Sequence, residues 1–212
     1  MPGRTISEML FEQLCSDCAV PCRRVPTGSL RTPDFEICLS AKRVFCEVKQ
    51  MDPNREDQKD IEALQSGQPV SRFVPNRFRQ KLKNVSRQLK AAASSGCPTL
   101  LVVYDNTPFK LYSGNRQIVQ AMFGRHTVSV RSSGPGHKQP AVSEPFFGGD
   151  RGLTPSQNTS VSALALLDGG PTSVLSLRVY HNPYASVVLR PGMLAAFPSV
   201  QEVLPEDTTV DL

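Results

Sequence analysis

The segment Thr32–Gln50 constrains the fold of this chain most, because it reads as two strands joined by a short turn. With the two-residue period of a strand, its second half alternates between an apolar face and a charged face. The apolar face holds Val44, Cys46 and Val48, and the other holds Phe45, Glu47 and Lys49. The preceding strand starts at Asp34, and Ser40–Lys42 is short enough to turn the chain back beside it. We therefore expect a hairpin that brings Asp34 towards Glu47 and Lys49, in a register that the sequence leaves open.

Two carboxylates and an ammonium group at the end of a sheet indicate a specific chemistry. The hard oxygens of Asp34 and Glu47 suit Mg²⁺, which takes one or two protein carboxylates and keeps several waters or phosphate oxygens. Lys49 would then orient a metal-bound water or help deprotonate it, and would offset charge on the phosphorus oxygens. The alternative is a surface hairpin whose Glu and Lys simply form an ion pair.

These residues resemble the motif of the PD-(D/E)xK, or restriction-endonuclease-like, nucleases, with Pro33-Asp34 as the first part and Glu47-Val48-Lys49 as the second. The resemblance implies an α/β core of helix, three-stranded meander, helix and strand. It also implies a metal-dependent nuclease in which Asp34, Glu47 and the backbone carbonyl of Val48 bind Mg²⁺ or Mn²⁺ and Lys49 is catalytic. DNA is the expected substrate on the same ground.

The first helix is expected from Thr5 to about Cys15, with a stripe of Ile6, Met9, Leu10 and Leu14. Thr5 and Glu8 match a capping box, so Glu8 either caps the helix or, as the resemblance implies, supplies a further carboxylate to the catalytic site. Glu12, four residues on, shares its face and is the auxiliary alternative.

The remaining core elements follow in the order that the resemblance implies. Arg23–Pro26 reads as a short first strand, Asn76–Ala93 as a helix with Phe78, Leu82, Val85 and Leu89 buried, and Thr99–Tyr104 as a strand buried on both faces. Gln88 lies in that helix, where several branches of the resembled family carry a Gln near the site, so it is an auxiliary candidate.

Between Arg72 and Lys90 the chain carries seven basic residues and no acidic one. Four of them fall on a single helical face: Arg79, Lys83, Arg87 and Lys90. Like charges at this spacing repel, so the face makes sense if a polyanion lies along it, and nucleic-acid phosphates are such a polyanion. The alternative is a solvated face.

The rest of the chain carries less information. We expect a nuclease-like core over 1–106 with a polar insertion at about 51–75, and a mostly β C-terminal extension over 107–212 packed on that core. Within the extension we expect a helix at Asn115–Phe123, a strand at His126–Val130, a mobile loop at about 131–158, and a hairpin of Val161–Leu167 with Val174–Tyr180. The residues from Glu202 on are expected to fray.

Composition limits the class of protein. The start of the chain lacks the apolar run of a signal peptide, and no stretch of about 18 apolar residues could span a bilayer. Six cysteines without a secretion signal fit a reducing compartment. We therefore expect a cytoplasmic protein with no membrane partner, and the sequence leaves a homodimer or larger assembly open. The alternative function is a non-catalytic nucleic-acid-binding or assembly subunit that keeps the nuclease fold.

Overall fold

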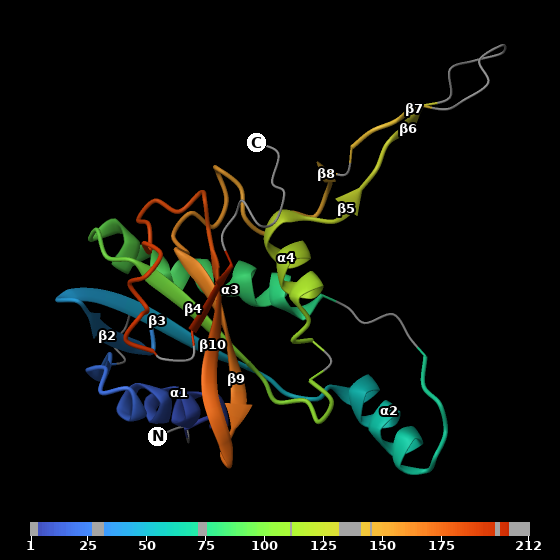
Figure 1. The fold of residues 1–212 in the computed structure, drawn as a ribbon, viewed down its shortest axis with the longest axis horizontal. Coiled ribbons are helices and arrows are strands. Elements are labelled where there is room, and N and C mark those ends of the chain that lie inside the picture. The colour runs from blue at the N-terminus through green and yellow to red at the C-terminus, as the bar shows by residue number, and fades with distance from the viewer. Residues whose placement is uncertain are drawn as a thin grey trace.

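The computed structural model describes residues 4–26, 32–71, 76–110, 112–131, 141–144, 146–197 and 200–203. It is a mixed α/β fold (Figure 1). The fold is built on a seven-stranded sheet of order β1-β2-β3-β4-β9-β10-β11. The strands of this sheet are β1 Cys22–Arg24, β2 Phe35–Leu39, β3 Lys42–Met51, β4 Thr99–Asp105, β9 Ala163–Gly170, β10 Ser173–His181 and β11 Val200–Val203. The helices in the described residues are α1 Ile6–Asp17, α2 Arg55–Gln65, α3 Arg77–Ser94 and α4 Asn115–Phe123. Four short strands form two further pairs: β5 His126–Thr127 with β8 Phe146–Phe147, and β6 Val130–Arg131 with β7 Ala141–Val142.

The expected hairpin is β2 and β3, and its turn is tighter than expected. Leu39 lies opposite Lys42, so only Ser40 and Ala41 form the connection. Both have positive φ, 48° and 63°, the backbone that a two-residue hairpin of type I′ needs. Lys42 therefore belongs to β3 rather than to the turn.

The sheet is covered on both faces, which gives two cores. Val44, Cys46 and Val48 pack on the side of α1, as the alternation predicts. Met51, Leu101 and Val103 face the opposite side, where they pack with apolar residues of α3 and α4. β3 and β4 run parallel, so the chain must cross over between them, and α3 makes that crossover.

The buried faces predicted for α3 and α1 differ in their agreement with the structure. The buried residues of α3 include all four of its predicted stripe, and Asn76 is its N-cap. In α1, by contrast, Ile6 and Met9 are exposed, so their place in the predicted stripe is wrong. The buried apolar residues are instead Leu10, Phe11, Leu14 and Cys15. They follow the same helical period, shifted so that Phe11 meets Phe35 at 5.6 Å between ring centroids.

The polar insertion contains α2, which is almost entirely solvent-facing. Its N-terminus is a capping box of Asn54 and Asp57, and Asp57 is the only buried residue of this helix. The Asp57 carboxylate accepts hydrogen bonds from Tyr112 Oη at 2.8 Å and from Arg77 at 3.2 Å. This carboxylate therefore anchors α2 to the body. Residues 72–75 lie outside the described part of the chain.

The C-terminal half extends the same sheet. β9 runs parallel to β4, and β10 returns antiparallel to β9, so the predicted hairpin continues the core. The helix at Asn115–Phe123 is confirmed as α4. The predicted strand His126–Val130 is wrong as one element, because β5 and β6 pair with different partners.

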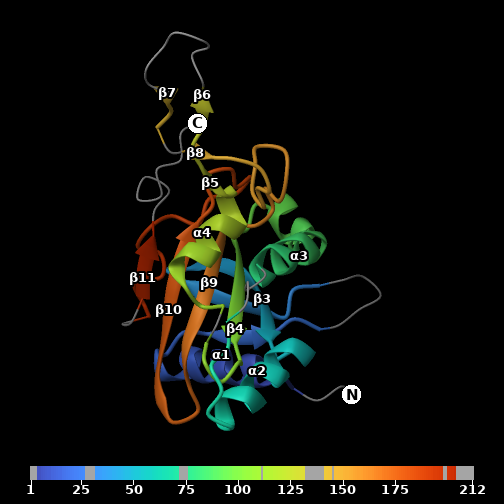
Figure 2. The same cartoon turned by 90° about the vertical axis from the view of Figure 1, so that its right-hand side faces the viewer.

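Two expected irregular segments contain strands. Within 131–158, the described residues include β7 and β8, and Phe147 and Leu153 are buried in the core; residues 132–140 and 145 lie outside the described part. Glu202 lies in β11, which pairs with β10. The β6–β7 pair and α2 project from opposite ends of the molecule (Figure 2). No helix among the described residues is long and apolar enough to cross a membrane.

Candidate active site

The β2–β3 hairpin brings the predicted residues together. Phe35 lies opposite Cys46, so Asp34, one residue before β2, reaches Glu47 and the residues that follow it. Asp34 Oδ2 accepts a hydrogen bond from the Val48 amide at 2.8 Å. Lys49 Nζ lies 3.9 Å from the same oxygen and donates to Glu47 Oε1. Two carboxylates and one ammonium group therefore meet at this end of the hairpin.

Glu47 is the buried centre of this group. Its side chain has no solvent exposure, and its Oε1 accepts hydrogen bonds from Lys49 and from Gln88 Nε2, the latter at 2.5 Å. Its Oε2 is buried without a hydrogen-bond partner in the described structure. Burial, together with the charge of Asp34, raises the pKa of Glu47 to about 7, although Lys49 and Gln88 act in the opposite direction. A buried, unpartnered carboxylate oxygen is costly, so a bound cation or proton would relieve it.

Asp34 connects this centre to α1. Burial raises the pKa of Asp34, the Val48 amide and Lys49 lower it, and the Glu8 carboxylate raises it further. Glu8 therefore lies close enough to Asp34 to share its electrostatic environment. A neighbouring carboxylate such as that of Glu8 can repel a second anion or share a cation with Asp34.

The two readings of Glu8 are resolved in part by its hydrogen bonds. The Thr5 hydroxyl accepts a hydrogen bond from the Glu8 amide at 3.3 Å, so the cap uses the backbone of Glu8. The Glu8 carboxylate instead forms an ion pair with Arg24 of β1. Glu12 is held by Arg4 at 2.9 Å and lies 3.8 Å from Arg24. Arg24 thus holds both acids of this helix face, and of the two it is Glu8 whose charge raises the pKa of Asp34.

The donor set fits a hard divalent cation with few protein ligands. Among the described residues, no group of three or more His, Cys, Asp or Glu side chains gathers closely enough to hold a metal ion. Asp34 and Glu47 are the two carboxylates available to a cation, because the nearby carboxylate of Glu8 is paired with Arg24. Two carboxylates are what Mg²⁺ normally takes from a protein, and the unpartnered Glu47 Oε2 is a free ligand atom. The site therefore suits Mg²⁺ or Mn²⁺ and offers little to Zn²⁺, which prefers nitrogen and sulfur.

One cation near the site was missed by the sequence argument. Lys81 Nζ donates to the backbone carbonyl of Gln50 at 2.8 Å, and burial, with the nearby charges of Arg77 and Lys49, lowers its pKa. Lys81 precedes Gln88 by seven residues, which is about two helical turns. That spacing places both residues on one side of α3, so helical periodicity could have identified Lys81 from the position of Gln88.

The four basic residues predicted to bind nucleic acid do not join this group. Gln88 follows Arg79 by nine residues, about two and a half turns, so the two point to opposite sides of α3. Arg79 accordingly pairs with Asp150 at 2.9 Å, far along the chain from the carboxylates. Lys83, Arg87 and Lys90 are exposed. The four residues lie on one side of α3, about 100° to 180° around the helix axis from Gln88, which contacts Glu47.

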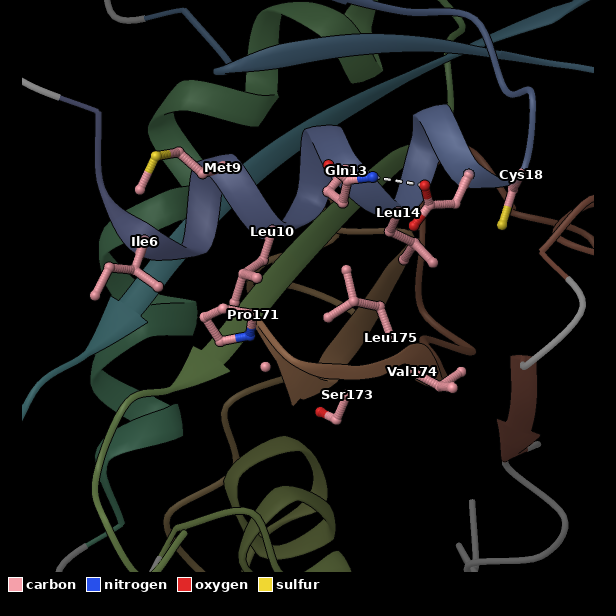
Figure 3. A pocket seen from close by; sticks show the side chains of 12 residues that line it. Ile6, Met9, Leu10, Gln13, Leu14, Cys18, Pro171, Ser173, Val174 and Leu175 are labelled. Carbon is pink, nitrogen blue, oxygen red and sulfur yellow. Dashed lines mark hydrogen bonds between the residues drawn. The ribbon is translucent and has the colours of Figure 1, made fainter.

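An apolar hollow of about 650 Å³ lies between α1 and the β9–β10 hairpin (Figure 3). Ile6, Met9 and Leu10 line it from α1, and Pro171 and Leu175 line it from the β9–β10 hairpin. The lining residues do not include Glu8, Asp34, Glu47 or Lys49, and the charged residue among them is Asp17. The hollow is therefore separate from the candidate active site.

Comparisons with protein-family models, curated proteins and solved structures found no match to this chain.

Proposed function

We propose that this chain is a metal-dependent phosphodiesterase that cleaves nucleic acid, with DNA as its substrate, on a restriction-endonuclease-like core. The single observation that carries the proposal is the group of Asp34, Glu47 and Lys49, with the buried Glu47 Oε2 left without a partner. A surface hairpin has no physical need to bury such an oxygen, because leaving it unpaired costs stability.

The order of elements supports the core assignment. α1 is followed by the antiparallel strands β1, β2 and β3, then by α3 and the parallel strand β4. This is the helix, meander, helix, strand order that the resemblance implies, with α2 added between β3 and α3. The candidate site lies where β2 starts and β3 approaches its end, next to α1 and α3.

Asp34 and Glu47 would hold the cation, together with the Val48 carbonyl. When bound, Mg²⁺ or Mn²⁺ would lower the pKa of a coordinated water and offset charge on the phosphate. Lys49, which is 29% exposed, would donate to the non-bridging phosphate oxygens and orient the attacking water. Gln88 fixes Glu47 Oε1 and so holds Oε2 in place.

Glu8 and Arg24 would act at the edge of this site. Their ion pair places a positive group near Asp34, which limits repulsion between Asp34 and the phosphate. In this role Glu8 positions Arg24 rather than binding the metal directly. Glu12, held by Arg4 and Arg24, supports the same arrangement.

The test is cleavage of labelled linear, branched and single-stranded DNA, with an RNA control, in Mg²⁺, Mn²⁺ or EDTA. Wild type is compared with Lys49→Ala and with Lys59→Ala, a matched control because Lys59 is an exposed lysine of α2. We expect metal-dependent cleavage by wild type and Lys59→Ala, and a loss of about 10²- to 10³-fold in Lys49→Ala. Binding without cleavage in either metal would contradict the proposal and favour a non-catalytic nucleic-acid-binding subunit.

A further inference from the structure

α3 presents two basic surfaces that differ in their surroundings. We call Arg77, Lys81 and Gln88 its site side, and Arg79, Lys83, Arg87 and Lys90 its outer side. The polar groups of the site side are bonded to the protein: Arg77 to Asp57, Lys81 to the Gln50 carbonyl and Gln88 to Glu47. These contacts direct the site side towards the carboxylates and the base of α2.

The outer side is largely free of such partners. Lys83, Arg87 and Lys90 have no acidic partner in the part of the chain that the structure describes, and all three are exposed. Arg79 shares Asp150 with Arg125, each at 2.9 Å, so even there two cations meet one carboxylate. The local charge stays positive, and a polar hollow of about 390 Å³ adjoins it, lined in part by Lys83 and Arg151.

The dimensions of the outer side fit a nucleic-acid strand. From Arg79 to Lys90 the helix rises about 16 Å, which equals the axial rise of about five base pairs of a duplex at about 3.4 Å each. Arg87 is exposed and directly precedes Gln88, so it lies about 100° around the helix axis from Gln88 and is the residue of the outer side nearest to the site side. A strand leaving the carboxylates could therefore cross α3 at Arg87 and continue along the outer side.

We propose that the outer side of α3 is an anchoring surface for the DNA backbone, separate from the catalytic group and contacted only by a substrate long enough to cross the helix. This inference rests on the proposed function for the identity of the substrate. It predicts that binding strength and catalytic rate are set by different residues. Loss of the outer side weakens binding of long DNA and leaves the rate of the bound complex unchanged.

The test uses the full chain and a labelled duplex of about 30 base pairs, roughly 100 Å long. Three exposed cations of the outer side are removed in one variant, and three exposed cations elsewhere are removed in a control of equal charge. The variant is Lys83→Ala/Arg87→Ala/Lys90→Ala, and the control is Lys42→Ala/Arg55→Ala/Lys59→Ala. Affinity is measured by fluorescence anisotropy in EDTA over a range of salt, and kcat and KM for the same duplex are measured in Mg²⁺ or Mn²⁺.

We expect the outer-side variant to bind at least about 10-fold more weakly at low salt, with the slope of log affinity against log salt reduced by about 3. Its KM should rise by a similar factor while kcat at saturating DNA stays within about two-fold of wild type, because the carboxylate group is intact. The control should lose much less affinity.

Two results would overturn the inference: an affinity loss no larger than that of the control, or a fall in kcat as large as the rise in KM. The second would place these cations within the active site. If wild type binds the duplex through the outer side but cleaves nothing in either metal, the anchoring surface stands and the proposed function fails. If wild type cleaves and the variant binds normally, the proposed function stands and the anchoring surface fails.

Discussion

Both sides of α3 carry basic residues, but the surroundings of those residues differ in the fold. On the site side, Lys81 is half-buried and bonded to a backbone carbonyl, and its pKa is lowered. On the outer side, Lys83, only two residues further on, is exposed with no acidic partner among the described residues. A run of basic residues therefore does not define one surface. The partners that the fold supplies decide which cations belong to a chemical site and which remain free to meet a polyanion.

The largest effect is expected at Glu47, whose carboxylate accepts a hydrogen bond from Gln88 on the site side. Replacing Glu47 with Gln should reduce cleavage by about 10³-fold or more, since Gln is a poor ligand for Mg²⁺. The outer-side variant, measured in the same assay at saturating DNA, should retain its rate. Equal rate losses in the two would remove the distinction between the sides.

The same substitution should stabilise the fold. The Glu47 carboxyl ionises near pH 4.5 in an unfolded chain, but burial raises the pKa in the folded state to about 7. The folded state binds this proton more tightly, so its stability falls as pH rises between these values and stays lower above them. At about pH 8, Glu47→Gln should therefore increase the free energy of unfolding by on the order of 3 kcal/mol. Urea denaturation without metal measures this, and a destabilised variant would contradict the cost assigned to the buried charge.

A smaller effect is expected from Gln88. Its hydrogen bond lowers the pKa of Glu47, so Gln88→Ala should shift the rise of activity, expected near neutral pH in wild type, to higher pH. We expect a loss of about 10-fold at neutral pH that largely recovers at higher pH. Gln80→Ala is the control, because Gln80 is an exposed residue of the same helix. A rate loss of equal size at every pH would show that Gln88 does not act through the ionisation of Glu47.

The smallest effect is expected at Asp150, the acid that neutralises part of the outer side. Asp150→Asn removes the partner of both Arg79 and Arg125 and should increase affinity for duplex DNA about three-fold at low salt, with the gain fading as salt rises. Glu144→Gln, which removes an acid elsewhere, is the control for net charge. Unchanged or weaker binding by Asp150→Asn would show that DNA does not contact the outer side near Arg79.

Much of this arrangement follows from local sequence pattern. The alternation from Val44 to Lys49 places the charged groups on the face away from α1, and the buried stripe of α3 follows the helical period. These predictions succeed because periodicity reports which face of an element is buried.

What the sequence could not supply depends on contacts distant along the chain. The register that puts Asp34 beside Glu47 rests on a turn at Ser40 and Ala41, residues that rarely indicate positive φ. The ion pair of Glu8 with Arg24 and that of Arg79 with Asp150 join elements with no shared pattern. Likewise, Phe147 is buried within a segment whose Gly and Pro content suggests a loop.

The central claim is that Asp34 and Glu47 together bind a divalent cation, and calorimetric titration of the full chain with Mn²⁺ at about pH 8, where Glu47 is ionised, tests it most directly. We expect one binding site in wild type, weakened at least about 10-fold in Asp34→Asn and unchanged in Glu144→Gln, which removes an exposed acid outside the site. Mn²⁺ affinity that is absent in wild type, or the same in Asp34→Asn, would contradict the claim.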